Sequence, residues 1–141
     1  MNRMKTINLV ITTPIKEVYN GQVEIVTLKT ANGFIGLQAN HAPFFSNIEP
    51  GKLEINSEKS KNYEKYLVGS GLIYCNGSEI NILTDDILLY DEIDIERAKK
   101  DRELALELLK QGNRIGPDMA KVELKLKKAI SKIDAYNEIH K

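Results

Sequence analysis

The nine residues Tyr90-Asp-Glu-Ile-Asp-Ile-Glu-Arg-Ala98 divide the chain into two halves with different patterns. Before this segment, apolar and polar residues alternate over short stretches that end in glycine, proline or asparagine, as β-strands do. After it, apolar residues recur every three or four positions, as they do in helices. Asp94 is suited to cap the first helix, because its short side chain can accept a hydrogen bond from an orphan amide of the first turn. The segment therefore predicts a β half joined end to end to a helical half.

The composition is that of an ordinary globular protein of 141 residues, long enough for one domain or for one domain with an appendage. No run of about 18 apolar residues is present, so the sequence predicts no transmembrane helix. The N-terminus is basic and then briefly apolar, and we interpret it as a first strand rather than a signal peptide because no small-residue cleavage site follows. Cys75 is the only cysteine, which excludes an internal disulfide and indicates a reducing compartment.

Charge is zero overall but is unevenly distributed along the chain. Residues 1–93 hold 8 Lys or Arg against 11 Asp or Glu, a net charge of −3, whereas residues 94–141 hold 12 against 9, a net charge of +3. The helical half therefore favours an acidic partner. The excess is far below that of a nucleic-acid-binding domain, so we expect no nucleic acid among the partners.

The β half consists of short alternating stretches separated by turn residues. Ile7, Leu9 and Ile11 share one face of the first stretch, and Leu53 and Ile55 share the inward face of a later one. The strongest turn signals are Asn20-Gly21, Asn32-Gly33, Pro50-Gly51, which is expected to close a strand, and Asn76-Gly77, which is expected to form a type I′ hairpin. Turn residues recur about every eight to twelve residues. This spacing predicts an antiparallel β-sandwich of about ten short strands over residues 1–90.

Residues 91–141 are expected to form two helices, over about 94–111 and about 117–139. Gly112 is suited to end the first helix, and Pro117 is favoured at the first position of the second. Apolar residues of the second helix form a coiled-coil-like seam with spacings of three and four: Met119, Val122, Leu126, Ala129, Ile133 and Tyr136. Because only a short connector joins the helices, they must be antiparallel if they pack on each other. The predicted fold class is thus α+β, a β-sandwich followed by a helical hairpin.

Four lysines of the second helix share one face, because they are spaced by four, three and four residues: Lys121, Lys125, Lys128 and Lys132. One interpretation is an ordinary solvated helix face with nearby acidic residues as local partners. The other is a docking strip for an acidic surface or for phosphates. The spacing alone leaves both interpretations open.

No combination of residues in the sequence supports catalysis. His41 lies in a loop, where a turn-stabilising role is favoured over that of a base, and His140 lies near the end of the chain. No nucleophile elbow, phosphate-binding glycine loop or zinc-type Cys/His spacing is present. The sequence therefore predicts a binding or mechanical role, with no catalytic residue, no metal and no required cofactor.

Taken together, these features resemble the epsilon subunits of F-type ATP synthases. The resemblance runs nearly end to end, and its most specific segments are Thr13-Pro14, Tyr19-Asn-Gly21, the stretch from Gly33 to Pro43, Pro50-Gly51 and the stretch from Ile93 to Ala98. It implies an N-terminal β-sandwich and a C-terminal pair of helices. It also implies a non-catalytic subunit of the central stalk, in the rotor of a bacterial proton- or sodium-driven synthase.

The resemblance also implies partners. The sandwich would pack against the gamma subunit and stand on the c-ring, and the positions that match this contact region are Phe34, Ile35, His41, Ala42 and Pro43. The helices would permit ATP hydrolysis when folded against the sandwich. Extended along gamma, they would reach the alpha and beta subunits of the catalytic hexamer and block hydrolysis, with Lys121, Lys125, Lys128 and Lys132 meeting an acidic segment of beta. The implied location is the cytoplasmic face of the bacterial inner membrane, with membrane contact only through partners.

Some members of this family bind ATP as a regulatory ligand at the folded hairpin. Their motif and two basic positions of the second helix are matched here, so the expected nucleotide-binding residues are Asp94, Arg97, Lys128 and Lys132. Those relatives have a further arginine where this chain has Leu104, so we expect weak binding. The alternative is that Asp94 and Arg97 only cap and brace the first helical turn.

Two interpretations from other functional classes stay open. One is a free-standing ligand-binding β-sandwich whose hairpin dimerises through the seam of the second helix; it predicts a homodimer without affinity for ATPase subunits. The other is an enzyme with an active site in the sandwich, which would need a pocket with an acid–base or metal cluster.

Overall fold

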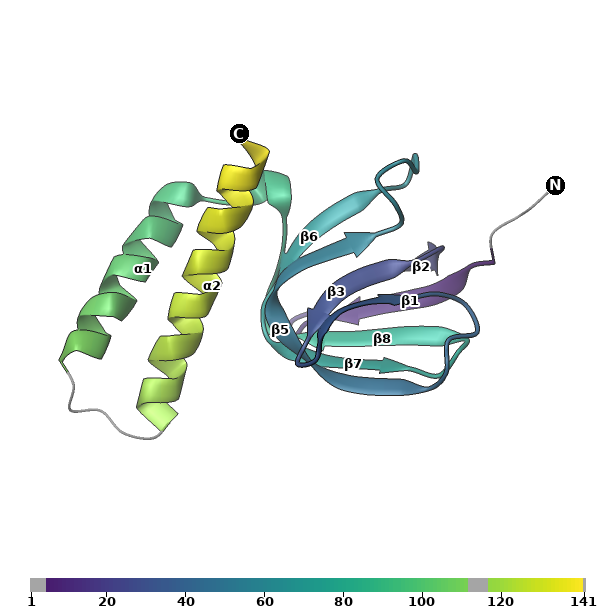
Figure 1. The fold of residues 1–141 in the computed structure, drawn as a ribbon, viewed down its shortest axis with the longest axis horizontal. Coiled ribbons are helices and arrows are strands. Elements are labelled where there is room, and N and C mark those ends of the chain that lie inside the picture. Colours follow the sequence, from purple (N-terminus) through teal and green to yellow (C-terminus); the bar gives the residue numbers. More distant parts are fainter. Residues whose placement is uncertain (1–4, 112–116, 141) are drawn as a thin grey trace. The chain divides into compact units, whose positions relative to one another are not determined.

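The computed structural model describes residues 5–111 and 117–140. The chain divides into two compact units, and the boundary between them in the sequence lies between Leu88 and Leu89. The strands precede the helices along the chain (Figure 1). The strands described in the structure are β1 (Ile7–Thr12), β2 (Glu17–Val23), β3 (Val26–Thr30), β4 (Gly33–Leu37), β5 (Phe44–Ile55), β6 (Glu64–Val68), β7 (Gly71–Cys75), β8 (Glu79–Thr84) and β9 (Ile87–Leu89). They are followed by the 3₁₀ turn η1 (Tyr90–Glu92) and by helices α1 (Ile95–Lys110) and α2 (Pro117–Ile139).

The strands are connected into one hydrogen-bonded path, β2-β1-β8-β7-β5-β3-β4, while β6 pairs with β5 and with β9. Neighbours in sequence such as β1 and β2, β3 and β4, or β7 and β8 are antiparallel, as their short connections require. The pair formed by β1 and β8 is parallel. These two strands are separated by most of the unit, so no hairpin constrains their direction. The pairs that β5 forms with β3, β6 and β7 are antiparallel.

Strand β5 changes partners along its length. Its first residues, Phe44–Ile48, pair with β7, and its last residues, 51–55, pair with β6. Leu53 and Ile55 also pair with β3. The expectation that Pro50-Gly51 closes a strand was therefore wrong. This dipeptide lies where one long strand changes partners, as happens at the corners of folded sheets.

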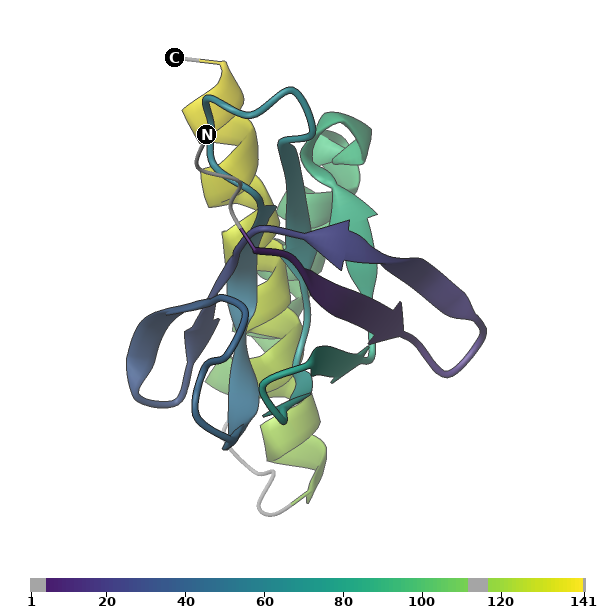
Figure 2. The same cartoon turned by 90° about the vertical axis from the view of Figure 1, so that its right-hand side faces the viewer.

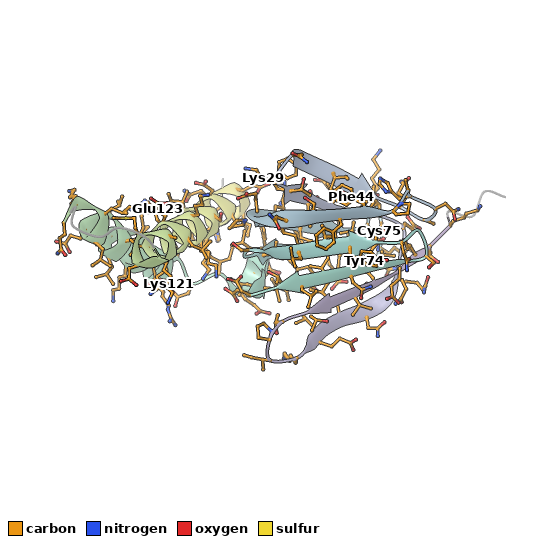
Figure 3. The ribbon with its side chains drawn as sticks, turned by 90° about the horizontal axis from the view of Figure 1, so that it is seen from below. Lys29, Phe44, Tyr74, Cys75, Lys121 and Glu123 are labelled. Carbon is orange, nitrogen blue, oxygen red and sulfur yellow. The ribbon has the colours of Figure 1, made fainter. Side chains whose placement is uncertain are left out.

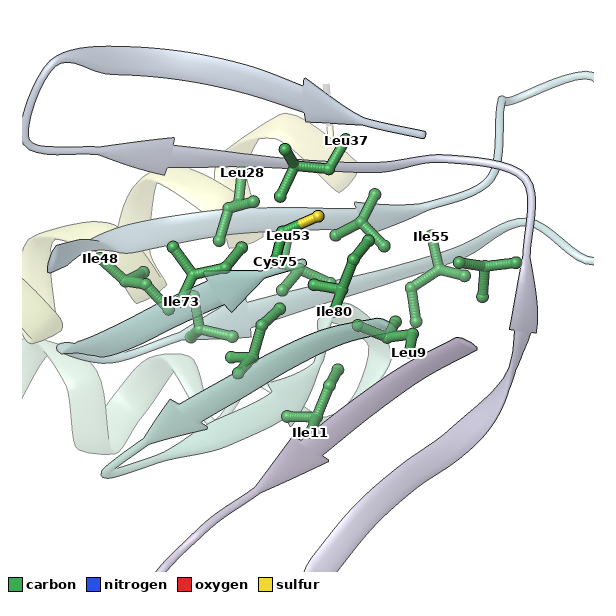
Figure 4. Close-up of a cluster of buried hydrophobic side chains, with 14 of the residues drawn as sticks. Leu9, Ile11, Leu28, Leu37, Ile48, Leu53, Ile55, Ile73, Cys75 and Ile80 are labelled. Carbon is green, nitrogen blue, oxygen red and sulfur yellow. The ribbon is translucent and has the colours of Figure 1, made fainter. Parts of the chain in front are cut away.

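The core of the sandwich consists of alternate residues that turn inward from several strands (Figure 4). The predicted inward face of β1 is confirmed, because Ile7, Leu9 and Ile11 are each at most 1% exposed. Other fully buried side chains are Leu28, Leu37, Leu53, Ile55, Ile73, Cys75 and Ile80. Burial of the free Cys75 makes it a small apolar core residue. The adjacent Tyr74 faces outward, as expected for alternation along a strand (Figure 3).

The predicted hairpin at Asn76-Gly77 is present, but it is not a type I′ turn. Only Gly77 has a positive φ, of 93°, and a type I′ turn needs a positive φ at both central residues. The side-chain oxygen of Asn76 instead accepts hydrogen bonds from the backbone amides of Ser78 and Glu79, at 3.0 and 2.9 Å. The asparagine therefore stabilises the turn with its side chain.

The second unit is the predicted helical hairpin, with α1 and α2 packed antiparallel against each other (Figures 1 and 2). Ala98 and Ala105 of α1 are buried, and so are Val122, Ala129 and Ile133 of the predicted seam. Small and β-branched side chains at these positions let the two helices approach closely. The other three residues of the predicted seam, Met119, Leu126 and Tyr136, are half-buried.

Candidate functional site

The candidate site is a groove between α1 and α2. Its volume is about 390 Å³, which is within the range of small-ligand sites, roughly 300–1,000 Å³. The residues that line it come from both helices: Arg97, Asp101, Leu104, Ala105, Glu107, Leu108 and Gln111 from α1, and Val122, Lys125, Lys128, Ala129 and Lys132 from α2.

Helix geometry explains why these residues share one groove. On α1, Arg97, Asp101, Leu104, Leu108 and Gln111 are spaced by four, three, four and three residues, so they form a single ridge. On α2, the lysines that line the groove follow the same rule. Antiparallel packing places the beginning of α1 beside the end of α2. The cations at these ends therefore lie on one side of the hairpin.

The groove brings together three of the four expected nucleotide-binding residues, namely Arg97, Lys128 and Lys132. A guanidinium and two ammonium groups can together bind phosphate oxygens. Leu104 also lines the groove and is 60% exposed, so it offers the groove an apolar contact. The arrangement fits a ligand that combines an anionic group with an apolar or aromatic one.

The fourth expected residue, Asp94, does not line the groove. It is the N-cap of α1, and its carboxylate oxygen Oδ1 accepts a hydrogen bond from the backbone amide of Arg97 at 3.1 Å. This geometry is what a capping aspartate provides. A role for Asp94 in nucleotide binding stays a prediction.

We expect that Asp94→Ala lowers the free energy of unfolding of the helical unit by about 1 kcal/mol, because an orphan amide loses its partner. Asp94→Asn keeps an acceptor and should cost much less. Thermal unfolding followed by helical circular dichroism measures both variants. A loss of nucleotide affinity in Asp94→Asn without loss of stability would instead assign Asp94 to the ligand.

The four lysines expected to contact the catalytic hexamer are divided by the structure. Lys125, Lys128 and Lys132 line the groove, whereas Lys121 does not and is exposed on α2 (Figure 3). Two of them, Lys128 and Lys132, belong to both expected sites. Lys125 was predicted only as a hexamer contact, and its place in the groove could have been found from its spacing of three from Lys128.

Asp101 and Glu107 are groove residues that the sequence interpretation missed. The sequence could have indicated Asp101, because it follows Arg97 by four residues and therefore lies on the same ridge of α1.

The expected contact region of the sandwich is divided between the two ends of β4. Phe34 lies near the beginning of this strand and is 65% exposed, while Ile35 points inward and packs against the core. Ala42 and Pro43 are exposed in the loop that follows β4. His41, in the same loop, places its Nδ1 at 2.7 Å from the carbonyl oxygen of Ala42, as expected for a turn-stabilising side chain.

The described residues show little else that suggests chemistry. Within residues 5–111 and 117–140 there is no group of three or more His, Cys, Asp or Glu side chains that could hold a metal. Burial, and then the nearby Glu64 carboxylate, raise the pKa of the Tyr19 phenol above its usual value, so this group stays protonated at neutral pH. No helix in the described part of the chain is long and apolar enough to cross a membrane.

Both halves of the chain match known protein families. Residues 6–89 match the family described as "ATP synthase, Delta/Epsilon chain, beta-sandwich domain", and residues 91–137 match "ATP synthase, Delta/Epsilon chain, long alpha-helix domain". A relative named "ATP synthase epsilon chain" from Mycoplasmopsis synoviae is 43% identical over 98% of this chain and 100% of its own length. Another, "ATP synthase epsilon chain, sodium ion specific" from Propionigenium modestum, is 33% identical over 92% of this chain and 93% of its own.

Solved structures support the same fold. A chain of the Euglena gracilis mitochondrial ATP synthase superposes with a TM-score of 0.75 at 24% identity, covering 92% of this chain and 81% of that chain. A chain from the central stalk and c-ring of the Tetrahymena thermophila mitochondrial enzyme gives a TM-score of 0.61 at 17% identity, covering 99% of this chain and 100% of that one. At these identities the likeness shows the fold alone.

Proposed function

Because this chain belongs to the ATP synthase delta/epsilon family, we propose that it is a non-catalytic subunit of the central stalk, which links the rotor to the catalytic hexamer. The observation that carries this proposal is the match of both halves, in order, over 98% of the chain to a relative named as an epsilon chain. The partners would be the gamma subunit and the c-ring for the sandwich, and the alpha and beta subunits for the helices. The protein would sit peripherally at the cytoplasmic face of a bacterial membrane, held there by these partners.

The two ends of β4 are the proposed contact surface of the sandwich. The Phe34 ring is 65% exposed on β4, so it is available to a partner. The loop at His41, Ala42 and Pro43 is fixed through its neighbour Asn40, whose backbone amide donates to the carbonyl of Gly77 at 3.0 Å. This loop is therefore presented by a rigid part of the sandwich, as a stalk contact requires. Ile35 would contribute by holding β4 on the core.

The helical hairpin is the proposed regulatory arm. A two-helix unit buries little apolar surface of its own, so opening it costs less than opening the sandwich. Extended, it would present Lys121, Lys125, Lys128 and Lys132 to an acidic segment of the beta subunit and inhibit ATP hydrolysis.

We further propose that the closed hairpin binds ATP weakly in the groove, through Arg97, Lys128 and Lys132. Binding would stabilise the closed state, because a ligand that binds one of two states shifts the equilibrium toward it. The same lysines cannot hold phosphates and an acidic protein segment at once. ATP is thus a regulatory ligand here and not a cofactor.

Two substitutions in the groove should change ATP affinity in opposite directions. Arg97→Ala removes a charge-assisted pair and should weaken binding about tenfold, while Leu104→Arg adds a cation at an exposed groove position and should tighten it about tenfold. Isothermal titration calorimetry on the full chain measures both. Lys99→Ala, on the exposed surface of α1, is the control for a general effect of charge. Equal affinities for all four proteins would contradict an ATP site in this groove.

A further inference from the structure

Three Asn-Gly dipeptides occur in the sequence, and their surroundings differ in the structure. They are Asn20-Gly21 in β2, Asn32-Gly33 between β3 and β4, and Asn76-Gly77 between β7 and β8. An asparagine loses its side-chain amide most readily when glycine follows it, because glycine has no side chain to shield its backbone nitrogen. The local structure therefore decides which of the three dipeptides is chemically vulnerable.

The Asn76 side chain is held by its own turn. Its Oδ1 accepts hydrogen bonds from the backbone amides of Ser78 and Glu79, at 3.0 and 2.9 Å, and from the Ser78 hydroxyl at 3.0 Å. A Cβ atom at Gly77 would lie 3.3 Å from the carbonyl oxygen of His41, so the space beside this glycine is limited. The carboxamide must leave its hydrogen-bond donors before it can react with the Gly77 nitrogen, and the turn therefore protects Asn76.

Asn20 is restrained by its strand. It pairs with Val10 of β1, and its side-chain Nδ2 donates to the Glu17 carboxylate at 3.3 Å. The Tyr19 ring lies near Gly21, because a Cβ atom at this glycine would be 3.6 Å from a ring carbon. A reaction between the Asn20 side chain and the next backbone nitrogen would have to disturb the β1–β2 pairing, so this position is also protected.

Asn32 lies exposed at the tip of the turn between β3 and β4. Its backbone amide donates to the Thr30 hydroxyl at 3.2 Å, but within residues 5–111 and 117–140 no hydrogen bond engages its side chain. Gly33 has a φ of 106°, and a Cβ atom built there would have no atom within 4 Å apart from those of its chain neighbours. The Asn32 carboxamide can therefore rotate toward a backbone nitrogen that no distant residue covers.

We propose that Asn32 is the Asn-Gly position at which the folded protein is modified by deamidation. The backbone nitrogen of Gly33 loses its proton and attacks the side-chain carbonyl carbon of Asn32. A cyclic succinimide closes as the bond from this carbon to Nδ2 breaks, and Nδ2 leaves as ammonia after taking up a proton. Water then opens the ring at either carbonyl and leaves aspartate or isoaspartate, with no oxidation or reduction.

The modification changes both charge and backbone at this turn. The new carboxyl group is ionised at neutral pH, so the turn gains a negative charge. Isoaspartate also carries the main chain through the former side chain, which lengthens the backbone by a methylene between residues 32 and 33. Because the Thr30–Gly33 pair closes the β3–β4 hairpin, this lengthening disturbs the end of β4 that presents Phe34. The inference goes beyond the proposed function and does not depend on it.

The test incubates the full chain at mildly alkaline pH, which favours loss of the amide proton, and follows each Asn-Gly position by peptide mass spectrometry. We expect deamidation at Asn32 to be at least about tenfold faster than at Asn76, because release of a hydrogen bond before ring closure slows a reaction by this order. The rate at Asn20 should lie between these two. In a denaturant the three rates should become similar, because the restraints of the fold are then lost.

The matched variant is Asn32→Gln, which keeps a carboxamide but would close a larger ring much more slowly. Cleavage after Lys29 and Lys52 gives a peptide that holds Asn32 together with Asn40 and Asn47. This peptide should gain mass in the wild-type protein and not in the variant, while the rates at Asn20 and Asn76 stay unchanged. The proposal is overturned if the variant peptide still gains mass at the wild-type rate, or if Asn20 or Asn76 reacts as fast as Asn32 in the folded chain. It is also overturned if the denatured chain shows the same differences in rate as the folded one.

Discussion

Gly71→Ala should lower the free energy of unfolding of the sandwich by about 3 kcal/mol or more. A Cβ atom at this position would lie 1.9 Å from the carbonyl oxygen of Leu83 and 2.9 Å from its carbonyl carbon. Both atoms belong to the backbone of β8, so no side-chain rotation can relieve the clash. Because β7 and β8 pair at this point, with Gly71 opposite Thr84, the two central strands would have to move apart.

Differential scanning calorimetry measures this effect, which corresponds to a fall in Tm of roughly 12–24 °C for a unit of this size. Gly21→Ala is a matched control within another strand, because its Cβ would lie 3.6 Å from the nearest atom, a side-chain carbon of Tyr19. We expect the control to change Tm by only a few degrees. An unchanged Tm in Gly71→Ala would show that β7 and β8 are not as closely packed as described.

Reversing the charge of the four-lysine stripe should abolish inhibition of ATP hydrolysis by the full chain. The variant carries Lys121→Glu, Lys125→Glu, Lys128→Glu and Lys132→Glu, and we expect its inhibitory constant to rise at least about a hundredfold. Attraction to an acidic segment of the beta subunit becomes repulsion at each of these positions. Binding of the sandwich to the rotor should remain, because no residue of that unit is altered.

The matched control reverses an equal number of exposed lysines elsewhere on the hairpin, at Lys99, Lys100, Lys110 and Lys127. Its net charge is the same as that of the stripe variant, so a general electrostatic effect would reduce inhibition equally in both. Inhibition that survives in the stripe variant, with both proteins folded by circular dichroism, would contradict the role of these lysines.

Local signals in the sequence predicted where the first helix begins. Asp94 marked the start of α1 because an N-cap is decided by one side chain and the next few amides. The continuation of β5 through Pro50-Gly51 could not be predicted in this way, since it depends on β3, β6 and β7, which are distant in sequence. The parallel pairing of β1 with β8 is equally non-local.

The candidate site was predictable where helix periodicity decides it. Arg97, Lys128 and Lys132 come together because the hairpin is antiparallel, and this followed from the short connector. The same periodicity would have revealed Lys125 and Asp101. The orientation of the side chains around β4 was harder to predict from the sequence, because adjacent residues of a strand face opposite sides. Phe34 is exposed and Ile35 packs inward, although both belong to one sequence motif.

The most direct test of the proposed function is ATP hydrolysis by the cognate catalytic core from which this subunit has been removed. The full chain, or a chain that stops after Asp91, is added back, and binding of each to the core is verified first. We predict that both proteins bind and that only the full chain inhibits. If both bind and neither inhibits, the hairpin is not a brake on hydrolysis, and if neither binds, the proposed place in the central stalk is wrong.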